Sequence, residues 1–398
     1  MITRAGGLLL GGSVALAIAG RVLGLVELTV LAGAGALLVA LAAARVRLLH
    51  PPLSVRRSVR PVRAQVGTPA RVEVEVVSTG RRTAPVLTLA DPIGDGPGAR
   101  LHLAAMGAGT TVRAAYRLPT RHRGAIPVGP LQAEVTDPFG LARRSRPVAE
   151  RVTLVVLPHV DPIAPAPQPA GSEPLSGQEG WAGLGRTGDE FHSLRPYVVG
   201  DDIRRVHWPM SARSDDLVVR LDDDPRQGRL TVVLDVQERA SRPEPFERMV
   251  SAAASIASAH WVRGDIVRLL QSDGRDTGWV TGQAAFESLL EVLAVTERVP
   301  AALLSRVLAR TDAGTDTVVA VTGDLTDVDI ASLPGRRSAR AGRLAGLSVV
   351  RFPAVGPGRA HQRVIEGVRV LDVGPDRAFA DVWGDAVSSR PRTPVGSP

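Results

Sequence analysis

The sequence predicts a membrane-anchored protein of several domains: two N-terminal transmembrane helices, a β-sandwich, and an α/β domain with a mostly parallel sheet. Three observations support this prediction. Residues 5–44 are apolar almost throughout, residues 53–160 alternate apolar and polar side chains, and residues 221–385 alternate strand-like and helix-like segments. A chain of 398 residues is also long enough for two or three domains with separate cores.

Shifts in composition set the expected boundaries, because Pro- and Gly-rich stretches separate segments with a regular apolar pattern. In chain order we expect a transmembrane hairpin (1–46), a β-sandwich (53–160), a Pro/Gly-rich linker (161–188), a charged and aromatic segment (189–220), an α/β domain (221–385) and a disordered tail (386–398).

The apolar tract of residues 5–44 is interrupted only by Arg21 and Glu27. One helix crosses a bilayer with about 20 residues, so a tract of this length suits two passes. A cleaved signal peptide fits less well, because a second and longer apolar run follows the first at once. We therefore expect helices at 4–20 and 23–44, with the turn near Arg21.

Arginines crowd the stretch after the second predicted helix, and no acidic residue precedes Glu73 there. Positively charged flanks stay in the cytoplasm during membrane insertion, although Arg21 in the predicted turn opposes this weakly. We expect both termini and the soluble domains to be cytoplasmic. The arginines of this stretch are Arg45, Arg47, Arg56, Arg57, Arg60 and Arg63.

The composition excludes several kinds of chemistry. The chain has no Lys, so it has no Walker A phosphate loop and no Schiff-base lysine, and all 48 basic residues are Arg. It has no Cys, which excludes disulfides, thiolate nucleophiles and cysteine zinc sites. The net charge of +8 reflects a GC-rich genome more simply than a nucleic-acid footprint, since aromatics are only 3%. We expect no nucleic-acid partner.

Residues 71–76 alternate Val with charged side chains, which is typical of a half-buried strand. Similar short segments separated by turn residues predict an immunoglobulin-like sandwich. It is either a rigid spacer between the membrane and the rest of the chain or a sandwich that binds a ligand or partner. The further strand candidates are 86–90, 111–118, 131–136 and 152–157.

Strand and helix patterns alternate in the last part of the chain, which predicts a mostly parallel sheet with helices on both faces. Asp235 and Asp324 each follow a predicted strand, at the edge where open α/β sheets bind ligands. The predicted strands are 230–234, 266–270, 317–321 and 347–352, and the predicted helices are 246–262, 284–294 and 303–309.

The segment 190–220 mixes rigid aromatics with charges that can pair, and it resembles the signature of the bacterial domain of unknown function 58 family, roughly R-x-Y-x-x-G-D-D-x-R-x-x-x-W-x-x-S-A-R. The Asp-Pro-Phe-Gly-Leu run at 137–141 also resembles the part that precedes this signature. The matching residues are Arg195, Tyr197, Gly200, Asp201, Asp202, Arg204, Trp208, Ser211, Ala212 and Arg213.

This resemblance implies a von Willebrand factor A-like α/β domain, a type that commonly holds Mg²⁺ through D-x-S-x-S after its first strand. Here Gln237 and Arg239 follow Asp235 where the two hydroxyls would stand, and an Arg beside a cation is electrostatically adverse. We therefore expect no cofactor and regard Mg²⁺ as unlikely to bind, with Asp235 and Asp324 as weak candidate ligands.

Two interpretations of the signature remain. In the first, Asp201 and Asp202 pair with nearby arginines, Trp208 anchors the segment by packing, and His207 forms an orienting hydrogen bond. In the second, Asp201 and Asp202 act with His192 or His207 as metal ligands or acid/base groups of a hydrolase. Carboxylates flanked by Arg are usually paired and ionised, so we favour the network and expect no catalytic residue.

The resemblance also implies a partner, because members of this family are often encoded beside MoxR-type AAA+ ATPases and other membrane proteins. We expect a membrane-anchored, non-enzymatic adaptor that works with such an ATPase in assembling or maturing envelope or other protein complexes. The alternative is a membrane-tethered, metal-dependent hydrolase that uses the Gly-Asp-Asp segment at 200–202. A third possibility is an Arg-rich binder of anionic lipid or nucleic acid.

Overall fold

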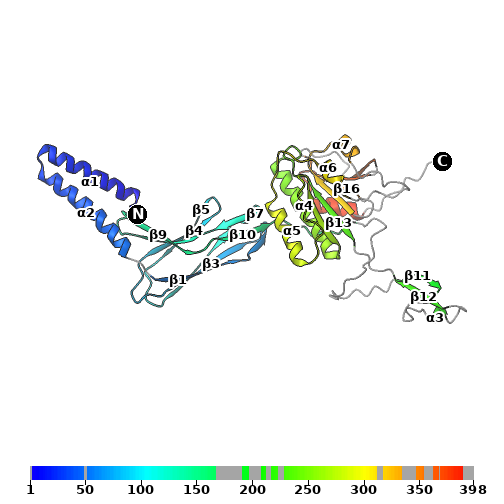
Figure 1. Ribbon diagram of the computed structural model, residues 1–398, viewed down its shortest axis with the longest axis horizontal. Helices are drawn as coiled ribbons and strands as arrows, with labels where there is room; N and C mark the ends of the chain where they lie inside the picture. The colour runs from blue at the N-terminus through cyan, green and yellow to red at the C-terminus, as the bar shows by residue number, and fades with distance from the viewer. Residues whose placement is uncertain are drawn as a thin grey trace. The chain divides into compact units, whose positions relative to one another are not determined.

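The computed structural model describes ten stretches of the chain, and for 191–196 and 218–222 it describes the backbone alone. Two compact units divide the chain: one holds the N-terminal helices and the β-sandwich, and the other holds the α/β domain (Figure 1). The stretches are 2–48, 52–166, 191–196, 208–211, 217–222, 228–311, 317–333, 347–353, 362–366 and 368–388.

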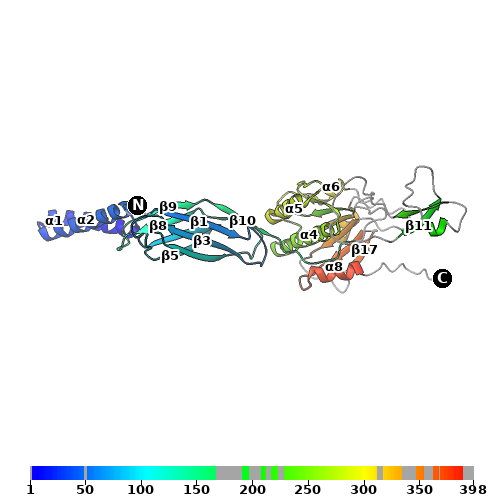
Figure 2. The same cartoon turned by 90° about the horizontal axis from the view of Figure 1, so that it is seen from below.

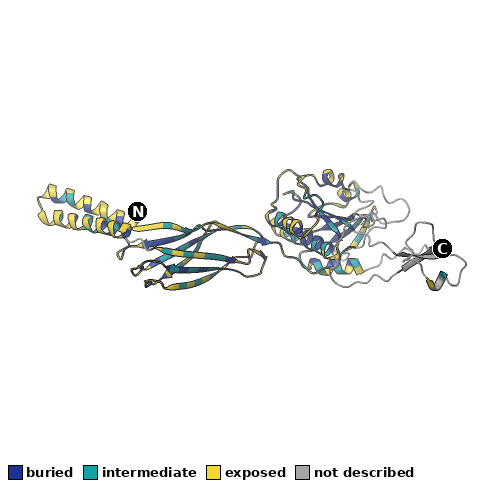
Figure 3. Cartoon of the chain, turned by 60° about the horizontal axis from the view of Figure 1, so that its bottom comes forward, coloured by how far each residue is buried: buried dark blue, intermediate teal, exposed yellow. Residues whose placement is uncertain are grey.

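The chain begins with a helical hairpin of α1 (Arg4–Leu23) and α2 (Val26–Leu48). Gly24, with φ 71°, ends α1 in the left-handed region that favours glycine, so the turn lies there. Arg21, which we predicted at the turn, lies instead in the last turn of α1. Both helices are long and apolar enough to cross a bilayer, and much of their surface is exposed (Figure 3). This finding supports membrane anchoring weakly.

The β-sandwich consists of two sheets, whose strands run along the length of the domain in Figure 2. The first has the order β1-β3-β6, from β1 (Leu53–Arg60), β3 (Ala70–Ser78) and β6 (Thr111–Leu118). The second has the order β2-β10-β7-β4-β8-β9, with β5 paired to β4. Its strands are β2 (Arg63–Gln65), β4 (Leu87–Ile93), β5 (Gly96–Leu103), β7 (Gly124–Val128), β8 (Leu131–Thr136), β9 (Arg143–Ala149) and β10 (Val152–Leu157).

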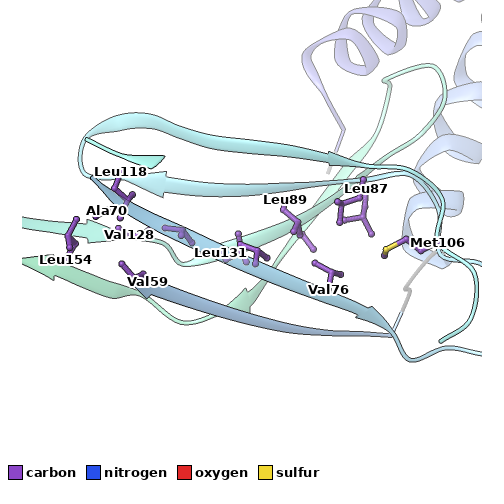
Figure 4. Packing of buried hydrophobic residues seen from close by; sticks show 14 of the residues in the cluster. Val59, Ala70, Val76, Leu87, Leu89, Met106, Leu118, Val128, Leu131 and Leu154 are labelled. Atoms are coloured by element: carbon purple, nitrogen blue, oxygen red, sulfur yellow. The ribbon is translucent and has the colours of Figure 1, made fainter. Parts of the chain in front are cut away.

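The predicted alternation along β3 is confirmed: Val72, Val74 and Val76 are buried, and the residues between them are partly exposed. They pack with Leu89 and Leu131 of the opposite sheet in one core (Figure 4). Alternation with a period of two places one face of each strand inward, which explains why the strand pattern could be predicted.

A buried polar group joins the two sheets. Asp91 of β4 accepts hydrogen bonds from Arg57 Nη1 of β1 at 2.8 Å and from Tyr116 Oη of β6 at 2.5 Å. Burial, together with the bond to Asp91, raises the pKa of Tyr116 above its usual range, so the phenol stays protonated and continues to donate. Arg57 and Asp91 are almost fully buried, so this pair also fixes how the sheets align.

The second unit has a mixed six-stranded sheet of order β14-β13-β15-β16-β18-β17, in which β17 alone is antiparallel. The predicted strands and helices are confirmed within a few residues, while β17, β18, α7 and α8 were not predicted. The strands are β13 (Arg229–Leu234), β14 (Ile266–Gln271), β15 (Thr317–Thr322), β16 (Leu347–Arg351), β17 (Gln362–Ile365) and β18 (Val368–Asp372). The helices are α4 (Pro243–Arg263), α5 (Gln283–Val295), α6 (Leu304–Leu308), α7 (Asp327–Ala331) and α8 (Phe379–Ser388).

Helices cover both faces of this sheet, because the chain steps from β13 to β14 in one direction and from β14 to β15 in the other. On one face, α6 and α7 share a core with Val233 and Val349. α4 and α8 lie together, since Arg248 of α4 stacks over Phe352, which also contacts Phe379 of α8. The strands are therefore buried on both sides, as their continuous apolar runs predicted.

Residues 160–166, which we call the tether, pack against the α/β domain. Their backbone groups bond to side chains of α4 and α8: Asp161 N to Ser255 Oγ, Ala166 N to His260 Nε2, and Trp383 Nε1 to Ala164 O. The predicted linker begins at residue 161, so its first residues belong structurally to this domain. The other linker residues, 167–188, and the predicted tail from residue 389 onward lie outside the described residues.

Candidate functional site

The carboxyl edge of the α/β sheet gathers polar side chains from consecutive strands. Asp235 directly follows β13, Ser272 directly follows β14, and Thr322 ends β15. β13 lies between the other two strands: the next strand in the chain, β14, lies on one side of it, and the following strand, β15, lies on the other. In open α/β sheets this switch point is where ligands bind, which makes it the first place to look for a site.

The Asp235 carboxylate is buried, with 2% of its surface exposed, and donors from all three strand ends surround it. Oδ1 accepts from Ser272 Oγ at 2.9 Å and from Gln237 N at 3.2 Å, and Oδ2 accepts from Thr322 Oγ1 at 2.9 Å. Ser272 Oγ also accepts from Val236 N at 2.9 Å. The carboxylate thus ties β13, β14 and β15 together at their carboxyl ends.

The loops after β13 and β15 approach each other too closely for a side chain at Gly323. A Cβ there would lie 1.9 Å from the carbonyl oxygen of Ala240. The next residue, Asp324, donates its backbone N–H to the same oxygen at 2.6 Å and exposes its side chain. The structure therefore brings Asp235 and Asp324 to one switch point, but it buries the first and exposes the second.

These residues fit a Mg²⁺ ion poorly. The hydroxyls of Ser272 and Thr322 donate to Asp235 instead of offering both oxygens to a cation, and the loop after Asp235 supplies Gln237 and Arg239. Across the described residues, no three His, Asp or Glu side chains converge as metal ligands would. The geometry gives no support to a resident Mg²⁺, so we derive no chemistry from one.

A second polar group lies further along the same edge, where β16 and β18 end. Asp372 is fully buried and accepts from Arg351 Nε at 2.5 Å and from Arg363 Nη2 at 2.8 Å. Asp327 of α7 pairs with the same two arginines, at 3.2 Å and 2.9 Å. The hydrogen bond to Asp372 raises the pKa of Arg363, so this arginine stays ionised.

The surface is hollowed between α6 and the loops that follow β13 and β14. A hollow of 730 Å³ is lined by Gln237, Ser272 and Asp273 on one side and by Leu303, Arg306 and Arg310 on the other. Leu303 is 59% exposed, and its backbone N–H donates to the carbonyl of Ser272. The hollow therefore combines an apolar residue with two arginines next to the Asp235 group.

A third polar cluster holds the tether. His260 is fully buried: its Nε2 accepts from Ala166 N at 3.0 Å and its Nδ1 lies 2.7 Å from Asp265 Oδ2. Burial lowers the pKa of His260, so the ring is neutral and carries its proton on Nδ1. Burial alone would raise the pKa of Asp265, but hydrogen bonds from His260 and Arg263 lower it. This cluster is structural, because each of its groups has an internal partner.

The family signature lies mostly outside the described residues. Its ends form an antiparallel pair, β11 (Phe191–Pro196) with β12 (Val218–Asp222), and Arg195 lies in β11 opposite Val219. Ser211 lies in α3 (Trp208–Ser211). The predicted site residues Tyr197, Gly200, Asp201, Asp202, Arg204, His207 and Arg213 lie outside the described residues, as does His192's side chain.

Trp208, which we expected to anchor the segment by packing, has 60% of its surface exposed. The helix that carries it, α3, is one turn long and contacts β12.

Sequence reasoning missed Ser272, Thr322 and the Arg351–Asp372 pair. The only signal available for them was position, since each polar residue lies at or just after the end of an apolar run that forms a buried strand. Which strands are neighbours in the sheet does not follow from their order along the chain, so the sequence could not predict that these residues lie together.

The family described as "Protein of unknown function DUF58" matches residues 193–338 of the chain, which include the signature and three of the six strands of the α/β sheet, β13, β14 and β15. This match supports the resemblance stated from the signature residues. A comparison with curated proteins found no match.

Several solved structures show a distant likeness. The CARDB domain of a Pyrococcus furiosus protein, solved with di-metal ions, is 16% identical and covers 27% of this chain and 94% of that domain, with a TM-score of 0.22. A β-glucosidase from Listeria innocua is 13% identical over 26% of this chain and 17% of the enzyme, with a TM-score of 0.17. Similarity this low does not bear on function.

Proposed function

We propose that this protein is a membrane-anchored, non-enzymatic adaptor whose α/β domain binds a partner protein at the carboxyl edge of its sheet. The observation that carries the proposal is the state of the buried carboxylates at that edge. Asp235 accepts three hydrogen bonds and Asp372 is held by two arginines, so both are committed to internal partners. Such groups stabilise the edge, and neither of these two carboxylates is available as an acid or base.

What the edge does offer is a surface suited to a protein segment. The hollow presents the exposed side chain of Leu303 together with Arg306 and Arg310, one helical turn apart on and just after α6. An apolar anchor flanked by guanidinium groups suits a partner segment that carries a large apolar side chain beside carboxylates. The rigid loops around Gly323 and Asp235 hold this surface in place without needing the partner.

The partner that we propose is the one that the family resemblance implies, a MoxR-type AAA+ ATPase, with other membrane proteins as further clients. A chain without any Lys has no P-loop lysine of its own, so ATP-driven work requires such a partner. The proposal includes a cytoplasmic α/β domain, in keeping with the arginines that follow α2. It also includes the von Willebrand factor A-like character of this domain, which the parallel strand order and the switch point support.

The rival function is a metal-dependent hydrolase that uses Asp201 and Asp202 with His192 or His207. It differs from the adaptor in one testable way, since it requires activity from the chain alone. The third possibility, an Arg-rich binder, requires nucleic acid or lipid in place of a protein partner.

The test is co-purification of the full chain, in mild detergent, with the purified MoxR-type ATPase in ADP and in a non-hydrolysable ATP analogue. The variant L303D places a charge in the hollow, and R306E reverses one. Loss of a central interface anchor costs about 2 kcal/mol or more, so we expect each variant to bind at least about thirty-fold more weakly. The matched control is V262D, which changes an apolar residue that is 86% exposed at the far end of α4.

Binding that is equally strong in wild type, L303D and R306E would refute the carboxyl edge as the partner site. Hydrolysis of a phosphate or ester substrate by the purified chain, abolished by D202N and unaffected by L303D, would refute the adaptor and establish the rival. V262D must bind the ATPase as strongly as the wild type does if weaker binding by L303D or R306E is to be assigned to the hollow.

A further inference from the structure

The turn between β8 and β9, residues 137–142, is fixed against the ends of the two apolar helices. Thr3 donates from its backbone N to Leu141 O at 2.9 Å and from Oγ1 to Gly140 O at 2.6 Å. The approach is so close that a Cβ on Gly6, in the first turns of α1, would meet the Leu141 carbonyl. These contacts hold the turn directly against the start of α1.

The residues of α2 that contact this turn indicate its depth relative to the bilayer. Leu141 and Ala142 form a cluster with Val39, Ala42 and Val46 of α2. A crossing of about 20 residues that begins at the start of α2, residue 26, ends near residue 45. The contacted residues thus belong to the last turns of the crossing, which places the turn at the level of the bilayer interface.

The turn is built to present Phe139 outward. Asp137 is buried and accepts from Phe139 N at 2.9 Å and from Ala142 N at 2.5 Å, and Gly140 takes φ 70°. These bonds satisfy the turn's polar groups internally, and the Phe139 side chain at its tip remains 68% exposed. A large apolar side chain held rigidly at the level of lipid headgroups is favoured to enter the interface, since water is its alternative.

The same end of the sandwich is basic. Pairing of Leu53 with Ser78, and of Thr136 with Arg143, brings the loops 79–86 and 137–142 to the end where α2 joins β1. These two loops contain one acidic residue, Asp137, and it is buried. The exposed arginines of the helix ends and of these loops with their flanks are Arg4, Arg45, Arg47, Arg81, Arg82, Arg143 and Arg144, of which Arg143 also pairs with Glu134 of β8 at 3.3 Å.

We propose that this end of the sandwich is a lipid-binding surface, in which Phe139 enters the bilayer interface and the surrounding arginines bind anionic phospholipid headgroups. The surface would bind the near leaflet of the bilayer that α1 and α2 cross, so the inference rests on the proposed membrane anchoring and extends it. The sandwich gains a second attachment beside the hairpin, which fixes its orientation on the membrane. Phosphate groups are the expected ligands because guanidinium binds them in a bidentate manner.

The chain has no Cys, which allows a direct test by single labelling. The full chain carrying F139C, labelled with a polarity-sensitive fluorophore, is reconstituted into liposomes of phosphatidylcholine with or without phosphatidylglycerol. Nitroxide-bearing lipids and aqueous iodide serve as quenchers. Two control sites are L37C, in the middle of α2, and D95C, in the exposed turn between β4 and β5 at the other end of the sandwich.

We expect the F139C label to be quenched by nitroxide lipid and protected from iodide, and the D95C label to show the reverse. Removing two charges with R143Q/R144Q should lower the ratio of membrane-inserted to water-exposed F139C label in anionic liposomes by about five-fold per arginine. The charge-conserving variant R143K/R144K should restore this ratio. Without phosphatidylglycerol this difference between variants should disappear.

Iodide access to F139C equal to that of D95C, with L37C protected, would overturn the proposal and leave the anchoring intact. Iodide access to L37C as well would refute both. Protection of F139C in native membranes but not in liposomes would overturn the lipid assignment in favour of a protein partner. If the protection of the F139C label from iodide changes neither without phosphatidylglycerol nor in R143Q/R144Q, the proposed role of the arginines is wrong.

Discussion

At the scale of single residues, Asp235 joins three strands that are distant in the sequence. Its two oxygens receive bonds from the hydroxyls of Ser272 and Thr322 and from the backbone of Gln237. We predicted Asp235 just past a strand at the carboxyl edge of the sheet, and the structure places it there. The hydroxyls expected two and four residues after it are indeed replaced, but hydroxyls from β14 and β15 come to it instead.

Replacing Asp235 with Ala should destabilise the α/β domain, because the buried donors of Ser272, Thr322 and Gln237 lose their acceptor. Unsatisfied buried donors cost about 1–3 kcal/mol each, with partial relaxation, so we expect a loss of roughly 2–4 kcal/mol in the free energy of unfolding. Thermal unfolding of the full chain in detergent, followed by near-ultraviolet circular dichroism, measures this loss.

The matched control for that substitution is T322V, which removes one donor while keeping the carboxylate and should cost about 1 kcal/mol. A rise in melting temperature of the wild type with millimolar Mg²⁺, absent in D235A, would contradict the structural role. A site with a Kd near 10 μM would add about 2.7 kcal/mol at 1 mM Mg²⁺, a shift that is readily seen.

At the scale of elements, α4 shows how local signals and distant contacts combine. Pro243 begins the helix, and Gly264, with φ 97°, ends it in the left-handed region. The helix predicted at 246–262 from its apolar pattern is therefore extended by the structure to Pro243–Arg263. The sequence did not indicate that the same helix holds the tether through Ser255 and His260.

The bond between His260 and Ala166 should weaken in acid. Burial lowers the pKa of His260 below its ordinary value of 6.5, so the unfolded chain binds this proton more readily than the folded one. The associated stability is therefore complete above about pH 6.5, and it is lost as the pH falls through the folded pKa. Residue-resolved hydrogen exchange should show Ala166 N–H protected at pH 8 and less protected at pH 5, after correction for intrinsic rates.

The internal control for that measurement is Asp161 N–H in the same tether. It bonds to Ser255 Oγ, which does not titrate, so its protection should change less with pH. H260Q should remove the pH dependence at Ala166. Equal loss of protection at both amides would indicate that the whole tether detaches for another reason.

At the scale of the whole molecule, the chain joins an apolar hairpin and a sandwich in one compact unit to an α/β domain in another. The function proposed for each depends on the side of the membrane on which they lie. Arg45 and Arg47 in the last turn of α2, followed by further arginines in β1, favour the cytoplasmic side.

A reporter fused after Pro398 should accordingly be active only when it is of a kind that works in the cytoplasm, such as green fluorescent protein. An alkaline phosphatase fusion at the same position should be inactive. The control is the same pair of reporters fused after Gly24, in the short turn between α1 and α2, where the activities should be reversed. Phosphatase activity at Pro398 would overturn the topology and, with it, the access of a cytoplasmic ATPase.

Periodicity alone determined which segments are apolar helices, alternating strands and buried parallel strands, because a regular apolar face is a property of neighbours in the chain. That is why β6, β8 and β10 could be placed to the residue, and α4 within three. Strand order, by contrast, depends on contacts between segments far apart in sequence. Only the tertiary structure could therefore group Asp235 with Ser272 and Thr322, bury Asp372 between two arginines, and set the turn at 137–142 beside the ends of the two apolar helices.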